Sequence, residues 1–308
     1  MEVNHLTLDE RVFEKALRKK LSNETARILE IKYYYLSEKG VNFLSDLYEI
    51  CIKYMVPSNN EITKETKSEQ AANVVVKVEP LNELLHSIVS EQDLFDTELK
   101  VLRDVLPRIK EFVSHQLGPD LLYGCDVSRI IIMENLIERG FVMKDRQKGL
   151  SLLHSRLVVQ QLARLHAGSV AVFEKIDYQM SVYTSPAVDL LHFLNICPEF
   201  DLKYTQDNYY LKIYLDTLEE TMKNIGCKRK PPTMKQLKEA MHKRRLYAVF
   251  CGVILYLRMM ADKEDTEDFV LLFDELSGET KLDVFKNPDA VKLAHKMIPI
   301  MNERGYFD

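Results

Sequence analysis

The sequence predicts a mixed α+β fold in two lobes, and three observations lead to this prediction. Stretches rich in β-branched and aromatic residues occur in the first part of the chain. Beyond about residue 133, apolar residues recur almost wholly at helical spacing. The 308 residues are enough for two modest cores, and no internal repeat is present. We therefore expect an N-terminal lobe over residues 1–133 and a helical C-terminal lobe over residues 134–308.

The composition excludes several classes of protein. The chain has 42 basic and 47 acidic residues, a net charge of −5, so no surface built for nucleic acid is expected. The N-terminal "LDERVFEKALRKK" is too charged for a signal peptide. The longest apolar run, "LYAVFCGVILYL" (246–257), is too short to cross a bilayer and suits a buried helix. The five cysteines have neither metal-ligand nor redox spacing. We expect a cytoplasmic protein without membrane or nucleic-acid partners, and the sequence leaves the oligomeric state open.

The N-terminal lobe begins with a helix. Thr7 to Glu10 has capping-box spacing ahead of a single apolar face. Strands are predicted at 48–54 and 73–80, joined by a polar connection, 57–70, that lacks any periodicity. A helix follows over about 91–105, and "SRIIIMENL" (128–136) predicts one more buried strand. The apolar face of the first helix comprises Val12, Phe13, Ala16, Leu17 and Leu21, and that of the second includes Leu94, Phe95, Leu99, Leu102 and Val105.

The C-terminal lobe is predicted from four helical patterns. A stripe from Leu211 to Ile225 stops at Gly226, a residue suited to the position after a helix. Thr233 and Gln236 form a second capping-box candidate, and Asn287-Pro288 begins the last helix. The first helix of this lobe covers 151–174, and its expected buried face is formed by Leu152, Leu153, Leu157, Leu162, Leu165 and Val172.

Lys77 lies on an apolar strand, where its charge requires a negatively charged partner. Lys77 ends the apolar strand "VVVKV", and Glu98 follows one helix later, facing inward with Phe95. A lysine on an apolar strand is costly unless a carboxylate or a ligand anion satisfies it. Spacing alone favours an ordinary surface ion pair. The order of strand lysine, helix glutamate and apolar strand entering "MENL" is, however, that of protein-kinase-like folds, in which the lysine holds phosphate oxygens.

Longer stretches carry a more specific resemblance. They are "GVNFLSDLYEICIKY" (40–54), "VVVKVEP", "FDTELKVLRDVLP" (95–107), "IIIMENLIERGFVMKDRQKGLSLLHSRLVVQQLARLHAGSV" (130–170) and "IDYQMSVYTSPAVDLLHFL" (176–194). Their order resembles the ecdysteroid kinase-like family of insects, also labelled CHK kinase-like, whose relatives are choline kinases and aminoglycoside phosphotransferases. The resemblance covers most of residues 35–305. It implies a protein-kinase-like two-lobed fold and phosphorylation of small hydroxylated molecules, steroid hormones among them, with ATP and magnesium.

The resemblance also assigns roles to residues. The turn Gly40–Ser45 would cover the phosphates, although it holds one glycine, and Glu134–Leu136 would form the hinge that borders the adenine. Asn135 stands where the family usually has Asp. The implied ATP-binding residues are therefore Gly40, Ser45, Lys77, Glu98, Glu134 and Leu136.

Two aspartates match family positions in the C-terminal lobe. Asp177 in "IDYQ" resembles the aspartate of the family's "DFQ", which holds Mg²⁺ across the phosphates; its alternative is a turn residue at a strand end. Asp189 in "SPAVDLLHF" resembles a buried aspartate that accepts backbone N–H bonds from the catalytic loop. An exposed helical residue is the alternative, against which the apolar neighbours of Asp189 argue.

The family's catalytic loop has no counterpart in the chain. The loop has the form H-G-D-x-W-x-x-N, in which Asp positions the attacking hydroxyl and Asn holds metal. None of the eight histidines begins such a motif, and the chain contains no tryptophan. The helix ending in "LARLHAGSVAVFEK" runs directly into "IDYQ", so we place an internal deletion between Lys175 and Ile176.

A chain without this loop is expected to have no catalytic residues. Loss of a positioned base alone costs about 10²–10⁴ in rate, and a metal ligand is lost with it. Two hypotheses follow: a skipped-exon or mis-assembled version of an ATP-dependent small-molecule kinase, or a pseudokinase that binds nucleotide or a partner. The flanking motifs remain close to the family pattern, which favours the first.

Overall fold

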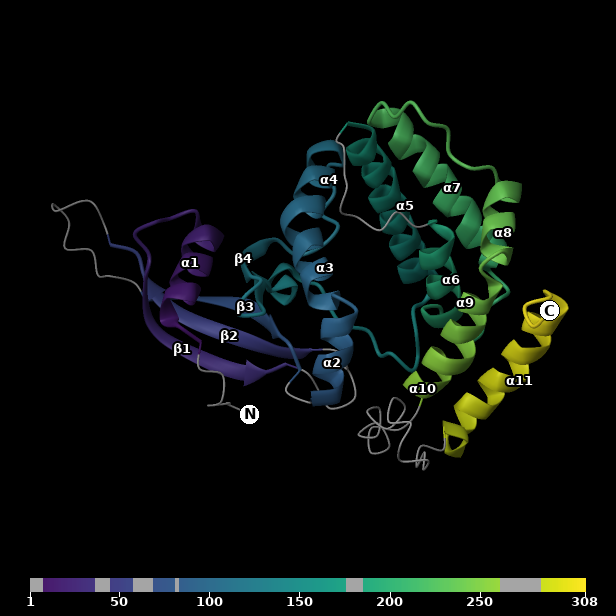
Figure 1. The fold of residues 1–308 in the computed structure, drawn as a ribbon, viewed down its shortest axis with the longest axis horizontal. Coiled ribbons are helices and arrows are strands. Elements are labelled where there is room, and N and C mark those ends of the chain that lie inside the picture. The colour runs from purple at the N-terminus through teal and green to yellow at the C-terminus, as the bar shows by residue number, and fades with distance from the viewer. Residues whose placement is uncertain (1–7, 37–44, 58–68, 81–82, 176–184, 261–283) are drawn as a thin grey trace. The chain divides into compact units, whose positions relative to one another are not determined.

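The computed structural model describes residues 8–36, 45–57, 69–80, 83–175, 185–260 and 284–308 (Figure 1). Two compact units divide the chain. The first, here called the sheet unit, contains the described residues up to Leu106 and those from Gly118 to Val142. The second, the helical unit, contains Pro107–Leu117 and the described residues from Met143 onward. The predicted α+β fold class is confirmed.

The sheet unit is built on five antiparallel strands in the order β1-β2-β3-β5-β4. The predicted strands at 48–54, 73–80 and 128–136 are confirmed as β2, β3 and β5. The other two are not predicted from the sequence, because no side chain of β1 is fully buried and β4 is short. The strands are β1 (Arg27–Tyr35), β2 (Asp46–Met55), β3 (Gln70–Val78), β4 (Leu121–Cys125) and β5 (Ile130–Glu134).

Helices contribute to a core on each face of this sheet. On one face, α1 (Glu10–Leu21) buries Phe13, Ala16 and Leu17 in a cluster with the sheet's alternate apolar residues, including Val74 and Val76. The first helix is confirmed, but Asp9 caps it rather than Thr7, which lies outside the described residues; the Asp9 carboxylate accepts the Arg11 backbone N–H at 3.0 Å.

The opposite face is covered by two helices where the sequence predicts one. These are α2 (Glu83–Glu91) and α3 (Leu94–Lys100), separated at Asp93, whose φ of 50° is left-handed. Helical structure continues from α3 through the π-helical η1 (Val101–Val105) to α4 (Leu106–Phe112). Leu94 is exposed rather than inward-facing, because the helix begins there. Buried residues of this face are Val89, Phe95, Leu99, Leu102 and Ile131.

The helical unit has one extensive core, formed by the elements after Met143. Its expected signals at Gly226, Thr233–Gln236 and Asn287 are confirmed: Gly226 has φ +70°, Thr233 forms a capping box, and Asn287 caps the last helix. The elements are α5 (Leu152–Lys175), α6 (Ala187–Ile196), α7 (Asp207–Asn224), α8 (Met234–His242), α9 (Arg245–Val249), η3 (Phe250–Tyr256), α10 (Leu257–Met259), η5 (Val284–Lys286) and α11 (Pro288–Glu303). None of these or the other described helices is long and apolar enough to span a membrane.

Two expected buried faces in this unit are confirmed only in part: Val172 of α5 and Tyr256 of the run 246–257 are buried. On α5, Leu152, Leu153 and Leu157 are exposed, and the residues that are fully buried include Val159, Ala163 and Ala167. Small side chains let α5 pack closely against α7, so the largest apolar residues do not mark the buried face. The run 246–257 divides among α9, η3 and α10 and is amphipathic, because Leu246, Phe250 and Ile254 are exposed.

A buried lysine closes the C-terminal end of α6. Lys203 is 1% exposed, and its ammonium donates to the backbone carbonyls of Ile196 at 2.7 Å and Asn195 at 3.1 Å. The same nitrogen lies 4.0 Å from the centroid of the Tyr256 ring. A cation at a helix C-terminus satisfies carbonyls that lack intrahelical donors. Burial nevertheless lowers the pKa of Lys203 to about 7.

This pKa predicts a pH-dependent stability. The unfolded chain keeps Lys203 protonated up to about pH 10.4, whereas the folded chain releases that proton near pH 7. The unfolded state therefore binds more protons between these values, and stability contributed by this group rises with pH. Denaturant unfolding between pH 7 and 9 should show a rising free energy of unfolding. Lys203→Met should flatten that rise, and an unchanged slope in the variant would contradict the assignment.

Candidate functional site

Lys77 lies on the face of the sheet that α2 and α3 cover. In β3 it pairs with Leu47 of β2 and with Ile131 of β5. Directly paired residues point to the same side of a sheet, and Ile131 is buried against α3. The Lys77 ammonium therefore projects from an otherwise apolar row, with one fifth of its side chain exposed.

Glu98 is the partner of Lys77. Phe95 and Leu99 anchor α3 on the sheet, and Glu98 lies on the same helix with its carboxylate against the Lys77 ammonium. The pair is partly exposed, so it remains accessible to an anion from solvent. An ammonium held in place by one carboxylate can hold phosphate oxygens with its remaining N–H donors.

The chain that follows β5 forms a second part of the site. Here called the hinge segment, it comprises Glu134–Arg139: the end of β5, the extended residue Asn135, and the 3₁₀ turn η2 (Leu136–Arg139). Gly140 ends the turn with φ +82°, in the left-handed region that favours glycine. The backbone N–H of Glu134 donates to the Asp120 carbonyl at 3.0 Å, and its carboxylate lies 3.3 Å from the Arg139 guanidinium.

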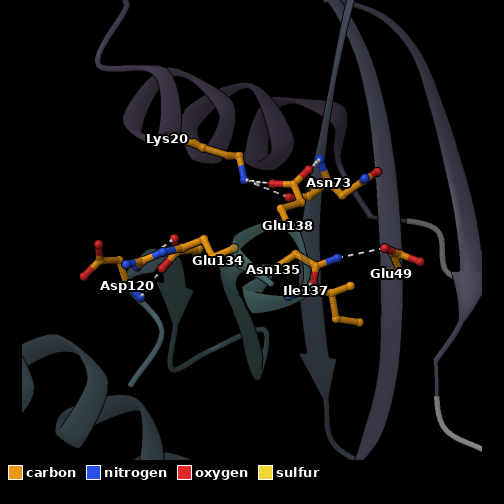
Figure 2. Close-up of polar contacts among 9 residues, drawn as sticks. Lys20, Glu49, Asn73, Asp120, Glu134, Asn135, Ile137 and Glu138 are labelled. Atoms are coloured by element: carbon orange, nitrogen blue, oxygen red, sulfur yellow. Dashed lines mark hydrogen bonds and ion pairs between the residues drawn. The ribbon is translucent and has the colours of Figure 1, made fainter. Parts of the chain in front are cut away.

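The hinge segment also contacts β2, β3 and α1 of the sheet unit, as Figure 2 shows. Asn135 is 2% exposed and donates its side-chain N–H to the Glu49 carboxylate of β2 at 2.7 Å. At the other end of the turn, Glu138 accepts from Lys20 of α1 at 2.7 Å and from the backbone N–H of Asn73 at 2.9 Å. These contacts fix the path of a segment that would otherwise be a surface turn.

The other predicted ATP and metal residues are placed only in part. Ser45 is buried immediately before β2, at 3% exposed. Leu136 begins η2, so the backbone of the expected hinge follows directly from β5. Gly40 and Asp177 lie outside the described residues.

Asp189 is not the buried aspartate that the family resemblance implied, and the argument from its apolar neighbours against an exposed position is wrong. Its side chain is 49% exposed, because it lies on the outer side of α6, and its carboxylate accepts from His166 Nε2 of α5 at 2.9 Å. His166 Nδ1 lies 2.8 Å from the hydroxyl of the buried Tyr214. A carboxylate only accepts, so Nε2 carries the proton, and in the neutral imidazole Nδ1 accepts from Tyr214.

Sequence reasoning misses Glu49 and Lys20 as well as the His166 pair. Glu49 lies two residues from Leu47 on the less buried face of β2, and its strand alternation is visible in the sequence. No spacing rule links it to Asn135, which is 86 residues away. His166 gives no separate signal within the long apolar pattern of its helix.

Together, the antiparallel sheet, the β3 lysine held by a helix glutamate, and the hinge segment after β5 define a protein-kinase-like fold. The chain belongs to the ecdysteroid kinase-like family, whose sequence profile matches residues 39–175 and 174–227. The family supports a small-molecule kinase-like function. No curated protein and no solved structure matches significantly.

The surface position of Asp189 predicts a small mutational effect. Asp189→Asn keeps an oxygen acceptor for His166, so it should lower the free energy of unfolding by less than about 1 kcal/mol. Tyr214→Phe leaves a ring nitrogen of the partly buried His166 unpaired and should cost about 1–3 kcal/mol. Chemical denaturation of both variants provides the comparison. A cost of about 3 kcal/mol or more for Asp189→Asn would contradict the exposed placement.

Proposed function

We propose that this chain is an inactive form of an ATP-dependent small-molecule kinase that retains part of the nucleotide-binding apparatus. The family-level role is phosphorylation of a hydroxyl on a small molecule, of which an ecdysteroid-like steroid is one candidate. The observation that carries the proposal is the Lys77–Glu98 pair, because it presents a held ammonium on the sheet face where a phosphate can reach it. We place the protein in the cytoplasm.

The described residues fit a nucleotide phosphate. Lys77 would contact phosphate oxygens while Glu98 holds the ammonium, and the backbone of Glu134–Leu136 would border the adenine. Ser45 and Gly40 would lie in the stretch that covers the phosphates. ATP supplies the transferable phosphoryl group and Mg²⁺ neutralises its charge. Asp177 would hold the metal.

The inactivity is proposed from the chain's own sequence. No H-G-D-x-W-x-x-N loop is present, and no histidine of the chain is followed by an aspartate and an asparagine at the spacing of that loop. The family match is divided into two segments that meet at residues 174 and 175, which supports a loss of sequence at the Lys175–Ile176 junction. Phosphoryl transfer depends on positioning and charge neutralisation, so the combined loss removes both the base and a metal ligand.

A pseudokinase is the second candidate function. In that case the chain in which Ile176 directly follows Lys175 is the functional gene product, and it acts by binding nucleotide or a partner. The fixed hinge segment and the retained ion pair are compatible with such a role. The match of residues on both sides of the junction to one family favours the first candidate.

Nucleotide binding is predicted to depend on Lys77. Mg²⁺-ATP at 100 times its Kd should stabilise the purified chain by about 2.7 kcal/mol, measured as a rise in Tm. Lys77→Met should abolish the rise. Lys53→Met is the matched control, because Lys53 also forms an ion pair with a glutamate on the same sheet, 2.7 Å from Glu30. No rise in the unmodified chain, or an equal rise in Lys77→Met, would refute this part of the proposal.

The origin of the junction is predicted to be visible in transcripts. Sequencing across the codons of Lys175 and Ile176 should find most transcripts with intervening sequence that encodes H-G-D and a following asparagine. Genomic DNA without such sequence, or transcripts that all join these codons directly, would favour the pseudokinase and contradict the first candidate.

A further inference from the structure

We propose that Glu49 and Asn135 form one coupled unit that positions the hinge segment for nucleotide, which makes Glu49 a positioning residue of the site. The inference rests on the proposed function, in which the backbone of Glu134–Leu136 borders the base. It assigns to a strand glutamate a role that follows neither from the family resemblance nor from the Lys77–Glu98 pair.

Asn135 joins two elements through both ends of its amide. Its Nδ2 donates to Glu49 Oε1 at 2.7 Å, and its Oδ1 accepts the backbone N–H of Ile137 at 3.0 Å, which caps the turn η2 (Figure 2). At 2% exposed, the amide has little access to water that could replace either partner. A buried group that loses its partner incurs its desolvation cost in full.

The strand register places Glu49 on the face that carries Lys77. Glu49 pairs with Val75 of β3, and Val75 pairs with Met133 of β5, the residue before the hinge segment. Val75 and Lys77 are two residues apart on one strand and therefore point to the same side. The contact between Glu49 and Asn135 thus attaches the hinge segment to the sheet face from which the phosphate-binding ammonium projects.

The chemistry of the contact requires an amide at position 135. Carboxylates only accept hydrogen bonds, so an aspartate there could still cap Ile137 but would face Glu49 as a second anion. Two carboxylates at this distance cannot both remain ionised without a large cost. The neighbouring Glu49 carboxylate therefore favours an amide over a carboxylate at position 135. The contact is charge-assisted, and such hydrogen bonds are stronger than those between two neutral groups.

The Lys20–Glu138 ion pair does not substitute for this contact. It holds the far end of η2, together with the Asn73 backbone, while Asn135 holds the first residues after β5. Loss of the Glu49 contact should therefore shift Glu134–Leu136 without unfolding the turn. Such a shift would appear in nucleotide affinity more strongly than in secondary structure.

The test is a double-mutant cycle with two readouts: denaturant unfolding of the nucleotide-free chain and Mg²⁺-ATP affinity by calorimetry. Asn135→Asp should weaken affinity at least tenfold, because it opposes two carboxylates. Glu49→Gln should stay within about threefold of the unmodified chain, since its amide oxygen still accepts from Asn135. The double variant Glu49→Gln/Asn135→Asp should also recover to within about threefold, because the introduced glutamine amide can donate to the introduced carboxylate.

Controls separate this coupling from a general charge effect. Glu30→Gln/Asn135→Asp removes a carboxylate elsewhere on the sheet and should give no rescue. If Asn135→Asp does not fold, Glu49→Ala provides the comparison with Glu49→Gln: the alanine variant leaves the amide unpaired and should lose at least tenfold in affinity.

The outcomes distinguish this inference from the proposed function. A double variant as weak as Asn135→Asp, or equal affinities of Glu49→Ala and Glu49→Gln, would overturn the coupling. Normal nucleotide affinity in a variant whose unfolding shows the coupling would overturn the positioning role and leave the proposed function intact. An unmodified chain that binds no Mg²⁺-ATP would overturn both, while the unfolding cycle alone would still establish the contact.

Discussion

The sheet unit depends on the requirement that an ammonium on an apolar strand must have a charged partner. Lys77 lies between Leu47 and Ile131 on the sheet face that packs against α3. Glu98 of that helix forms an ion pair with it. The register of β2, β3 and β5 and the position of α3 must all be correct for the two groups to meet. Without this partner, burial of the Lys77 charge would destabilise the folded state by more than most single apolar contacts stabilise it.

Among the described residues of the helical unit, the charge of Asp189 is stabilised by solvent and by a histidine. The core of this unit is continuous among the described residues, and Asp189 does not carry the unsatisfied buried charge that a lost set of backbone donors would create. Solvent reaches the carboxylate, and His166 supplies a donor that is itself held by Tyr214. The exposed position of Asp189 therefore places no demand for buried backbone donors on the fold of this unit.

The sequence predicts the features that depend on local patterns and cannot predict those that depend on partners distant in the chain. Alternation and β-branched residues locate β2, β3 and β5, and turn chemistry locates Gly226, Thr233 and Asn287. The positions of large apolar residues predict the wrong buried face for much of α5, because close packing against α7 favours alanines over leucines.

The same distinction applies to the site. The pairing of Lys77 with Glu98 can be predicted from the sequence, because a lysine on an apolar strand requires an oppositely charged partner. Glu49 and Asn135 cannot be, since only the sheet register brings them together. Family resemblance supplies the roles of Ser45, Glu134 and Leu136, which the residue types alone do not indicate.

The central claim is that a nucleotide-binding part remains while the capacity for phosphoryl transfer is gone. The most direct measurement incubates the purified chain with Mg²⁺ and ATP labelled at the terminal phosphate, together with a set of small hydroxylated molecules that includes ecdysteroid-like steroids. The account predicts no labelled organic phosphate above that formed without protein. Labelled product that forms with the unmodified chain and disappears in Lys77→Met would contradict it.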